Sequence, residues 1–294
     1  MTIPSHLYLV LKDTLLKETY APLSCSTFQK KIKSEENNFM IPIRNSKEVE
    51  QMRLSGRIAA MILEELAGMI VPGITTKNID EAAGKLMDAA QVRSAFLGYR
   101  NFPGRICISL NEEVVHGIGS SRRRIQYGDI VKLDVGIIRD GWIGDTAATI
   151  PAGIVLPKVA RLVSTTQKIL MSAISIATAG RRLGDLSAHI EECTLAAGYS
   201  VVREFVGHGV GRILHEEPQI PNFGERGTGP TLQAGMTLAI EPMINFGKAN
   251  VRILEDKWTV VTADGSQSAH FEHTVLITNE RPEILTCPRK MPLQ

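Results

Sequence analysis

Residues 128–153 read GDIVKLDVGIIRDGWIGDTAATIPAG, and this stretch predicts a β-hairpin that carries two aspartates, Asp134 and Asp145. Asp140-Gly141 marks the turn, because both central residues of a two-residue type I′ turn need a positive φ angle. Aliphatic and β-branched residues dominate on both sides of the turn, as strands require. The rest of the chain is interpreted outward from this hairpin.

The position of the turn determines which residues face each other across the two strands. Arg139 lies opposite Trp142, and counting outward places Gly136 opposite Asp145. Asp134 lies two residues before Gly136 and therefore shares a sheet face with Asp145. The two aspartates form a diagonal pair, with Cβ atoms roughly 7 Å apart.

Apolar neighbours indicate that this pair of aspartates is buried. Val131, Leu133 and Val135 point to the opposite face of the same strand. Two like charges this close on a half-buried strand repel each other and lose hydration, so they need a bound cation or shared protons. The alternative is a pair of solvated acids near a turn, which is the commoner outcome for acids in hairpins.

Composition limits the class of protein. The chain has 294 residues, of which 44% are hydrophobic, and a net charge of +2. These values suit one large domain or two halves with a shared core, and they give no general signal for nucleic acid or membrane binding. An apolar run at residues 7–11 is too short for a signal peptide, and no stretch approaches a transmembrane span. We expect a cytoplasmic protein.

The four cysteines lie far apart in the sequence, with no CxxC pair. This spacing predicts neither a zinc finger nor a framework of disulfides. Residues 1–45 form a predicted N-terminal extension, for which a poorly ordered arm and a docking element remain open alternatives. Residues 46–294 form the predicted main domain.

A helical pair recurs along the chain. Helices are predicted from Ser46 to about Val71 and from Thr76 to Ala90, and again over 159–177 and 186–197, because apolar residues repeat there at 3.6-residue spacing. A shift of 107 residues superposes Gly73 on Gly180 and Ile79 on Leu186. The pattern indicates an internal duplication, each copy being followed by strands.

The strands between these helices favour an α+β fold with a central antiparallel sheet and helices packed on its outer face. Besides the hairpin strands at 126–138 and 142–150, strands are predicted at 105–110, 114–116, 237–244, 258–262 and 271–278.

Three later segments supply partners for the aspartates. His208 lies between two glycines, Glu241 ends an apolar strand, and Glu272 begins another. A carboxylate in such a run is seldom left unpaired when it is buried. With the hairpin pair they make four carboxylates and one imidazole, whose charge balances two divalent cations. Oxygen-rich ligation favours Mn²⁺, Fe²⁺ or Co²⁺ over a cysteine-rich zinc site.

The chain resembles the type I methionine aminopeptidases over about residues 46–286. Five ordered motifs carry the resemblance: VVHG at 114–117, the DV…GDTA hairpin, GHGVGRILHEEP at 207–218, IEPM at 240–243 and FEHTVLIT at 271–278. The family has the pita-bread fold, in which two pseudo-symmetric αβ halves surround a central site. The resemblance implies two divalent ions (Co, Mn, Fe, Zn or Ni), with Asp145 and Glu272 bridging both, held by Asp134, Asp145, His208, Glu241 and Glu272.

The resemblance also implies a reaction and its partners. A metal-bridging hydroxide attacks the first peptide bond and releases the initiator Met when the next residue is small. Glu241 is the general base, His215 stabilises the oxyanion, and His116 contacts the substrate amide. The substrates are the N-termini of nascent chains, and the family favours a monomer. Contact with the ribosome, through the extension or through Arg122–Arg124, is a hypothesis from charge alone.

A pocket for the methionine side chain follows from the same resemblance. Its predicted residues are Phe96, Tyr99, Phe102, Cys107, Leu214 and Trp258. Spacing alone favours ordinary core packing for these side chains. Leu214 stands where a Phe often precedes the second substrate histidine, a change that loosens the pocket.

Two other readings stay open. An Xaa-Pro peptidase of the same fold is the enzymatic alternative, although such enzymes usually carry a larger N-terminal domain. A non-catalytic pita-bread binding protein is the alternative from another class, although degenerate members lose ligands. His189 and His270 have no motif support and are predicted to be surface or core residues. Strand alternation places His273 on the face opposite Glu272, which predicts a structural role.

Overall fold

The predicted hairpin forms the centre of the structure. In the computed structural model, which describes residues 40–287, β4 (Ile130–Arg139) and β5 (Trp142–Pro151) pair antiparallel. Gly136 lies opposite Asp145, as the position of the turn predicts. Asp140 and Gly141 have φ angles of 50° and 76°, the left-handed conformation that a type I′ turn requires.

A nine-stranded sheet surrounds this hairpin within the described residues. Its main path runs β1-β4-β5-β14-β9-β7-β8, while β2 pairs with β4 and β15 pairs with β14. Besides β4 and β5, the strands of this sheet are β1 (Arg93–Ser94), β2 (Cys107–Leu110), β7 (Gly207–Gly209), β8 (Glu216–Ile220), β9 (Thr237–Ile240), β14 (Glu272–Leu276) and β15 (Glu283–Ile284).

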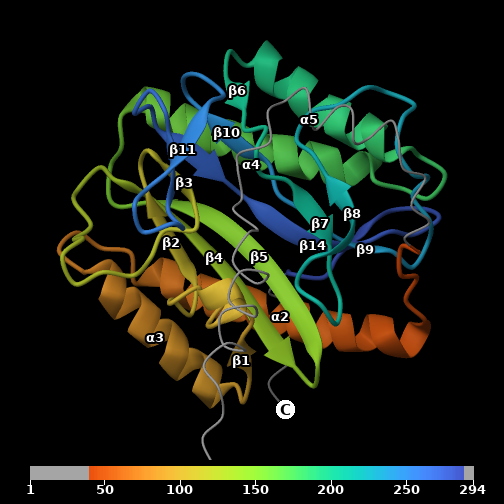
Figure 1. The fold of residues 1–294 in the computed structure, drawn as a ribbon, viewed down its shortest axis with the longest axis horizontal. Helices are drawn as coiled ribbons and strands as arrows, with labels where there is room; N and C mark the ends of the chain where they lie inside the picture. The colour runs from red at the N-terminus through yellow and green to blue at the C-terminus, as the bar shows by residue number, and fades with distance from the viewer. Residues whose placement is uncertain (1–39, 288–294) are drawn as a thin grey trace, which may run out of the picture. The chain divides into compact units, whose positions relative to one another are not determined.

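Four helices come in two pairs within residues 40–287 (Figure 1). The first pair is α2 (Ser46–Gly68) and α3 (Thr76–Ala89), and the second is α4 (Pro157–Ile176) and α5 (Leu183–Ala196). One apolar core joins α2 and α3 to β2 and β4, and another joins α4 and α5 to β9 and β14. The predicted α+β fold of two αβ halves is confirmed.

The internal duplication is confirmed in detail. The same 107-residue shift superposes α3 on α5 from first residue to last. It also superposes the hydrogen bond from Gly73 N to Ile125 O, at 2.8 Å, on that from Gly180 N to Leu232 O, at 2.9 Å. Both glycines have a positive φ angle and lie in the turn that joins the two helices of each pair.

Packing of the apolar side chains of β4 against the helices places the aspartates on the opposite face of the sheet. Val131, Leu133 and Val135 are fully buried in the core beneath α2 and α3. Because side chains alternate along a strand, Asp134 points away from these helices. One side of the central sheet is thus packed with helices, and the other side holds the polar groups.

The prediction of one continuous strand over 237–244 is wrong, because this segment forms two strands that belong to different sheets. β9 ends at Ile240, and β10 (Met243–Asn245) pairs with β6 (Ser200–Val201) and β13 (Ser268–His270). Pro242 separates the two strands, and a proline has no backbone N–H for a ladder hydrogen bond. The other predicted strands are observed, most of them shorter at one end.

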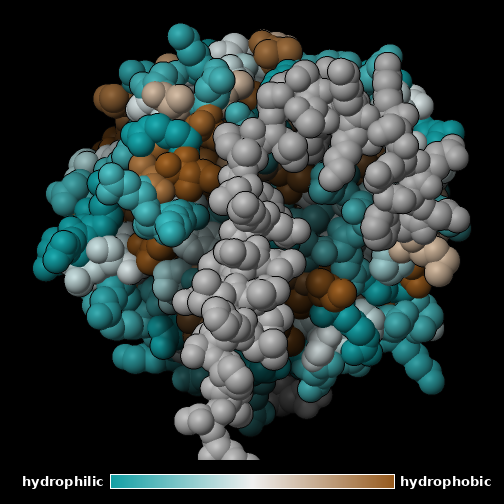
Figure 2. Space-filling model, in the orientation of Figure 1, coloured by the Kyte–Doolittle hydropathy of each residue, from teal (hydrophilic) through white to brown (hydrophobic). Residues whose placement is uncertain are grey.

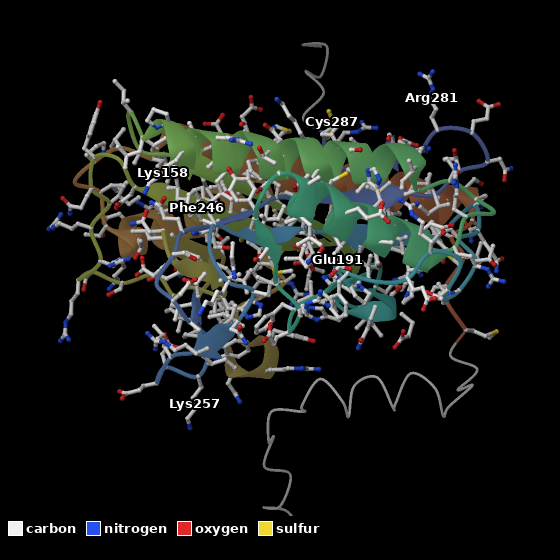
Figure 3. The ribbon with its side chains drawn as sticks, turned by 90° about the horizontal axis from the view of Figure 1, so that it is seen from above. Lys158, Glu191, Phe246, Lys257, Arg281 and Cys287 are labelled. Atoms are coloured by element: carbon white, nitrogen blue, oxygen red, sulfur yellow. The ribbon has the colours of Figure 1, made fainter. Side chains whose placement is uncertain are left out.

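A third sheet contains β3 (Glu113–Val115), β11 (Val251–Ile253) and β12 (Val260–Thr262). Lys257 lies in the turn between β11 and β12 and projects from the side of the molecule opposite α4 (Figure 3). Phe246 directly follows β10, and the ammonium of Lys158 of α4 lies 5.5 Å from the centre of its ring (Figure 3). Of the two smaller sheets, the one that contains β6, β10 and β13 packs against the second helix pair.

The predicted extension lies outside the described residues except for positions 40–45. There Arg44 forms an ion pair with Glu216 and donates its backbone N–H to Gly235 O at 2.8 Å. On the visible surface, hydrophobic areas are separated by hydrophilic ones (Figure 2). None of the helices between residues 40 and 287 is long and apolar enough to cross a membrane.

Candidate metal centre

Five neighbouring strands bring the predicted metal ligands together. The order β4-β5-β14-β9-β7 places one ligand candidate on or directly after each strand. In that order the residues are Asp134, Asp145, Glu272, Glu241 and His208. Their sequence separations are large, yet the sheet places them side by side.

The tightest group contains Asp145, His208 and Glu272, all buried, whose candidate ligand atoms lie within 4.8 Å of one another. His208 Nε2 is 3.9 Å from Oδ2 of Asp145 and 3.6 Å from Oε1 of Glu241. Its Nδ1 lies 3.0 Å from Gly209 O, and an N–H donated there leaves Nε2 free to face the carboxylates. Asp134 lies outside the tightest group and adjoins it from the middle of β4.

Glycines on both sides of His208 allow the strands to approach closely. A Cβ atom at Gly207 would lie 2.4 Å from Ala239 O, and one at Gly209 would lie 2.2 Å from Glu217 O. Neither distance is possible for a real side chain, so only glycine permits this packing. The glycines therefore set the depth at which the imidazole of His208 enters the cluster.

Burial and mutual repulsion raise the pKa values of the carboxylates. Burial, followed by the neighbouring Glu241 carboxylate, raises the pKa of Asp134 to about 8. Burial and nearby carboxylates also hold the pKa values of Asp145, Glu241 and Glu272 well above their ordinary values. Burial lowers the pKa of His208 to about 3, so its imidazole is neutral and can act as a ligand. The cluster needs positive charge.

Unsatisfied oxygens test whether the residues fit a metal. Oδ1 of Asp134, Oδ1 of Asp145 and Oε1 of Glu272 are buried and have no hydrogen-bond partner. Buried polar atoms without partners are rare, and a bound ion is one of the few explanations. Oxygen donors with one imidazole suit a hard or borderline divalent cation. The residues present fit a divalent metal site.

The two histidines assigned to the substrate flank this cluster. The ring centres of His215 and His208 are 4.4 Å apart, and Nδ1 of His215 lies 2.8 Å from the hydroxyl of Tyr99. Burial and the charge of Arg100 lower the pKa of His215 to about 4. His116 has a left-handed φ angle of 60°, an unusual conformation that is enriched at functional sites.

All six residues of the predicted methionine pocket belong to one apolar cluster. Phe96, Phe102, Cys107 and Leu214 are buried in it, and Tyr99 and Trp258 pack against it. The rings of Phe102 and Trp258 meet edge to face at 5.1 Å, and Trp258 also contacts His116 at 6.1 Å. The cluster therefore adjoins the histidines, which core packing alone does not require.

Sequence analysis missed the position of His270. Its side chain is 1% exposed, and its Nε2 lies 3.3 Å from Oε2 of Glu241. Strand alternation could have indicated this position, because His270 lies two residues before Glu272 and residues two apart in a strand point to the same face. Sequence analysis used this alternation only for His273. Nδ1 of His273 lies 2.9 Å from Thr286 Oγ1, a contact that agrees with the structural role predicted for it.

His189 is half-buried between α4 and α5, where its Nε2 lies 2.7 Å from the hydroxyl of Ser172. This position is on the helical layer and not on the strands that carry the ligand candidates. It agrees with the prediction of a residue without a catalytic role.

Clustered carboxylates beside neutral histidines suit a metal-dependent hydrolase, because a divalent ion there would activate water and the histidines could donate hydrogen bonds to the substrate. The model of metallopeptidase family M24 matches residues 50–279. The chain belongs to metallopeptidase family M24.

Relatives and solved structures agree with this assignment. Methionine aminopeptidase 1 from Bacillus subtilis strain 168 is 45% identical over 247 residues, which cover 84% of this chain and 99% of the relative. The crystal structure of methionine aminopeptidase from Thermotoga maritima has a TM-score of 0.83 and 45% identity, and the match covers 84% of this chain and 99% of that one. The resemblance to methionine aminopeptidases inferred from the motifs is confirmed.

A prolidase is also similar, but only in fold. The prolidase from Pyrococcus furiosus has a TM-score of 0.68 and 23% identity, and the match covers 84% of this chain but 66% of the prolidase. At this identity the likeness shows a shared fold and no shared substrate. The Xaa-Pro alternative is therefore not favoured.

Proposed function

We propose that this chain is a methionine aminopeptidase that removes the initiator Met from nascent proteins when the next residue is small. The observation that carries the proposal is the gathering of Asp134, Asp145, His208, Glu241 and Glu272 at one point of the sheet. These residues come from five strands, and their charge suits divalent cations. Membership of a metallopeptidase family with methionine aminopeptidases among its similar members supports the same reaction.

The proposed centre holds two divalent ions. Four carboxylates carry the charge that neutralises two such ions, and Asp145 and Glu272 belong to the tightest group, as shared ligands require. Asp134 would complete one end of the centre, and His208 with Glu241 the other. When bound, such ions polarise a carbonyl group and make water a better nucleophile at neutral pH.

The chain's own groups supply the proton transfers. Glu241 accepts the proton of the attacking water, a role that suits a carboxylate whose pKa is raised by burial. His215 is neutral, and a hydrogen bond from the Tyr99 hydroxyl to Nδ1 leaves Nε2–H as the donor. We assign this N–H to the oxygen of the scissile carbonyl, where negative charge develops. His116 contacts the substrate amide.

The apolar cluster beside these histidines receives the methionine side chain. Sulfur–aromatic contacts contribute about 1 kcal/mol each, and Tyr99, Phe102 and Trp258 supply aromatic rings. Leu214, buried in the same cluster, is smaller and more flexible than a phenylalanine in that place. The proposed pocket therefore accepts methionine while allowing some variation in side-chain shape.

We also propose that the enzyme acts as a monomer in the cytoplasm and meets nascent chains at the ribosome. The basic run Arg122–Arg124 is exposed and offers one unpaired charge for that contact. Among the described residues, Arg123 lies 3.6 Å from both Glu112 and Glu113 and Arg124 donates to Gly73 O, whereas the guanidinium of Arg122 has no partner. Reversal of the charge at Arg122 with unchanged co-sedimentation with ribosomes would remove this proposal.

The decisive experiment compares three peptides with chelator-treated protein to which Mn²⁺ or Co²⁺ is returned. The proposal expects metal-dependent release of Met from Met-Ala-Ser, while Leu-Ala-Ser is not hydrolysed. Cleavage of Met-Pro-Ala alone would indicate an Xaa-Pro peptidase. No cleavage of any peptide with either metal would indicate a binding protein and overturn the proposal.

A further inference from the structure

His270 is a buried polar residue that the proposed mechanism does not use. It ends β13, and its side chain is almost fully excluded from solvent. Its Nε2 has no hydrogen-bond partner of acceptable geometry. Among residues 40–287, the one carboxylate within 4 Å of this nitrogen is Glu241, whose Oε2 lies 3.3 Å away. A buried nitrogen left without a partner costs free energy, so its surroundings are informative.

The backbone of His270 is fixed to the central sheet by Thr149 of β5. The His270 N–H donates to Thr149 Oγ1 at 2.9 Å, and Thr149 Oγ1 donates to His270 O at 2.7 Å. Two hydrogen bonds to one hydroxyl leave this residue little freedom to move away from the sheet. The imidazole is therefore held beside Glu241 by contacts that do not involve its own ring.

Lys132 of β4 fixes the same strand at a second point. Its side chain is 1% exposed, and its ammonium donates to Ser268 O at 3.0 Å and to Asn111 O at 2.7 Å. Lys132 and Thr149 lie directly opposite each other in the hairpin. A single cross-strand pair of the central hairpin thus holds both ends of β13 in place.

Glu241 has one oxygen on each side of this arrangement. Oε1 lies 3.6 Å from Nε2 of His208, and Oε2 lies 3.3 Å from Nε2 of His270. A carboxylate that can rotate exchanges its two oxygens and presents no fixed direction to a metal or a proton. A donor bound to Oε2 would remove that freedom and keep Oε1 directed at the ligand cluster.

We propose that His270 is a positioning residue, whose Nε2–H donates to Oε2 of Glu241 and keeps Oε1 turned toward His208. The terminal torsion of histidine has a broad energy minimum, so a small rotation of the ring aligns the N–H with this oxygen. A neutral imidazole carries one N–H, and this hydrogen bond fixes it on Nε2. The inference rests on the proposed role of Glu241 in the centre.

The test compares a variant that keeps the donor with one that removes it. His270→Gln retains an N–H group at similar reach, whereas His270→Leu retains much of the volume but donates nothing. His273→Leu is the matched control, because His273 is also a histidine beside Glu272 but contacts Thr286 on the other face. For each protein, calorimetry gives Co²⁺ affinity, the visible spectrum reports Co²⁺ geometry, and kcat and KM are measured with Met-Ala-Ser.

We expect His270→Leu to lose Co²⁺ affinity and kcat by about 10–100-fold, the range measured for partners of metal ligands. Its KM should change little, and its Co²⁺ spectrum should shift because Glu241 is no longer oriented. His270→Gln should restore all three quantities to within a few-fold of the wild type. His273→Leu should leave the Co²⁺ spectrum and affinity unchanged, even if it lowers the melting temperature.

Two results would overturn the inference. One is wild-type Co²⁺ affinity and spectrum in His270→Leu, and the other is equal damage in His270→Gln and His270→Leu. If the leucine variant does not fold, His270→Asn replaces it. The side chain of asparagine is one methylene shorter than that of glutamine, so its amide does not reach Glu241. The Co²⁺ affinity and the Co²⁺ spectrum are measured without turnover. A protein that cleaves no peptide would therefore overturn the proposed function and leave this test valid.

Discussion

The two halves of the protein share one plan but connect their strands differently. In each half a helical pair is followed by a strand with an acidic residue, and the 107-residue shift that superposes α3 on α5 also places Asp134 on Glu241. The isolated bridge between Thr75 and Arg124 recurs as the bridge between Arg182 and Thr231 at the same shift. The duplicated plan thus supplies one carboxylate from each half.

The difference lies between the two acidic strands. In the first half, β4 and β5 are joined by the two-residue turn at Asp140-Gly141. In the second half, β9 and β14 also pair, but β10, β11, β12 and β13 lie between them in the chain. That interposed segment carries Trp258 and His270. The repeated parts therefore provide ligand candidates, one from each half, while the unrepeated part carries side chains that have no counterpart in the first half.

The sharpest test of this comparison substitutes the second acid of each half. Asp145→Asn and Glu272→Gln each remove a charge and a residue that we propose as a shared ligand, so we expect each to abolish turnover, with a fall in kcat of at least about 100-fold. Bound Mn²⁺, measured by elemental analysis, should fall in both. The control is Asp140→Asn in the hairpin turn, where the acid is exposed and Asn tolerates a positive φ angle.

Near wild-type turnover in Asp145→Asn would overturn the assignment of two ions. A large loss of turnover in one variant and a small loss in the other would show that the two halves are not equivalent. A single ion, held tightly by the half whose variant loses turnover, would explain that result. Loss of turnover in Asp140→Asn would show that the hairpin is sensitive to any change of charge.

The first half could be predicted almost completely from the sequence, because local rules determine it. The turn at Asp140-Gly141 fixes the register, and one residue of slip would move every side chain to the wrong face. The positions of Asp134 and Asp145 follow directly from that register. The five predicted ligands come together because the hairpin and the three later motifs lie on adjacent strands.

The second half could not be predicted to the same depth, because its organisation depends on contacts between sheets. Pro242 ends β9 early and sends β10 into another sheet, although alternation had suggested one continuous strand. His270 meets Glu241 only because Lys132 and Thr149 hold β13 against the hairpin. Nothing in the local sequence around His270 specifies those partners.

A second prediction concerns the stability of the metal-free protein, to which both halves contribute acids. The pKa of Asp134 is raised to about 8 from an ordinary value of 3.8, so the folded state binds more protons than the unfolded state between these values. Stability therefore falls as pH rises through this window. The buried histidines His208 and His270 affect stability only below pH 6.5. Their pKa values are lowered in the folded state, so stability falls there as pH falls. From pH 6.5 to 8 one other buried group opposes this trend: burial lowers the pKa of Lys132 to about 7, which by itself would make stability rise with pH. The four carboxylates with raised pKa values outweigh this single lysine.

We expect the melting temperature of chelator-treated protein to fall from pH 6.5 to 8, and added Mn²⁺ to raise it most at pH 8. Metal binds the ionised carboxylates, so its affinity increases as they lose protons. Asp134→Asn should flatten the trend of the metal-free protein, because the amide does not titrate. A melting temperature that rises with pH in the metal-free wild type would contradict the raised pKa values.

The smallest predicted effect compares the beginnings of α3 and α5. Thr75 caps α3, since its Oγ1 accepts the Asn78 N–H at 3.2 Å and donates to Asn78 Oδ1 at 2.6 Å. At the corresponding place Arg182 makes no side-chain cap, although its backbone N–H donates to Asp185 Oδ2 at 3.1 Å. Thr75→Ala should therefore lower the free energy of unfolding by about 1 kcal/mol, measured with urea. Arg182→Ala should cost less, because it removes only an exposed hydrogen bond to Gly229 O. An equal or larger loss in Arg182→Ala would show that the second half depends on this contact, and that the two helices of the repeat begin by different means.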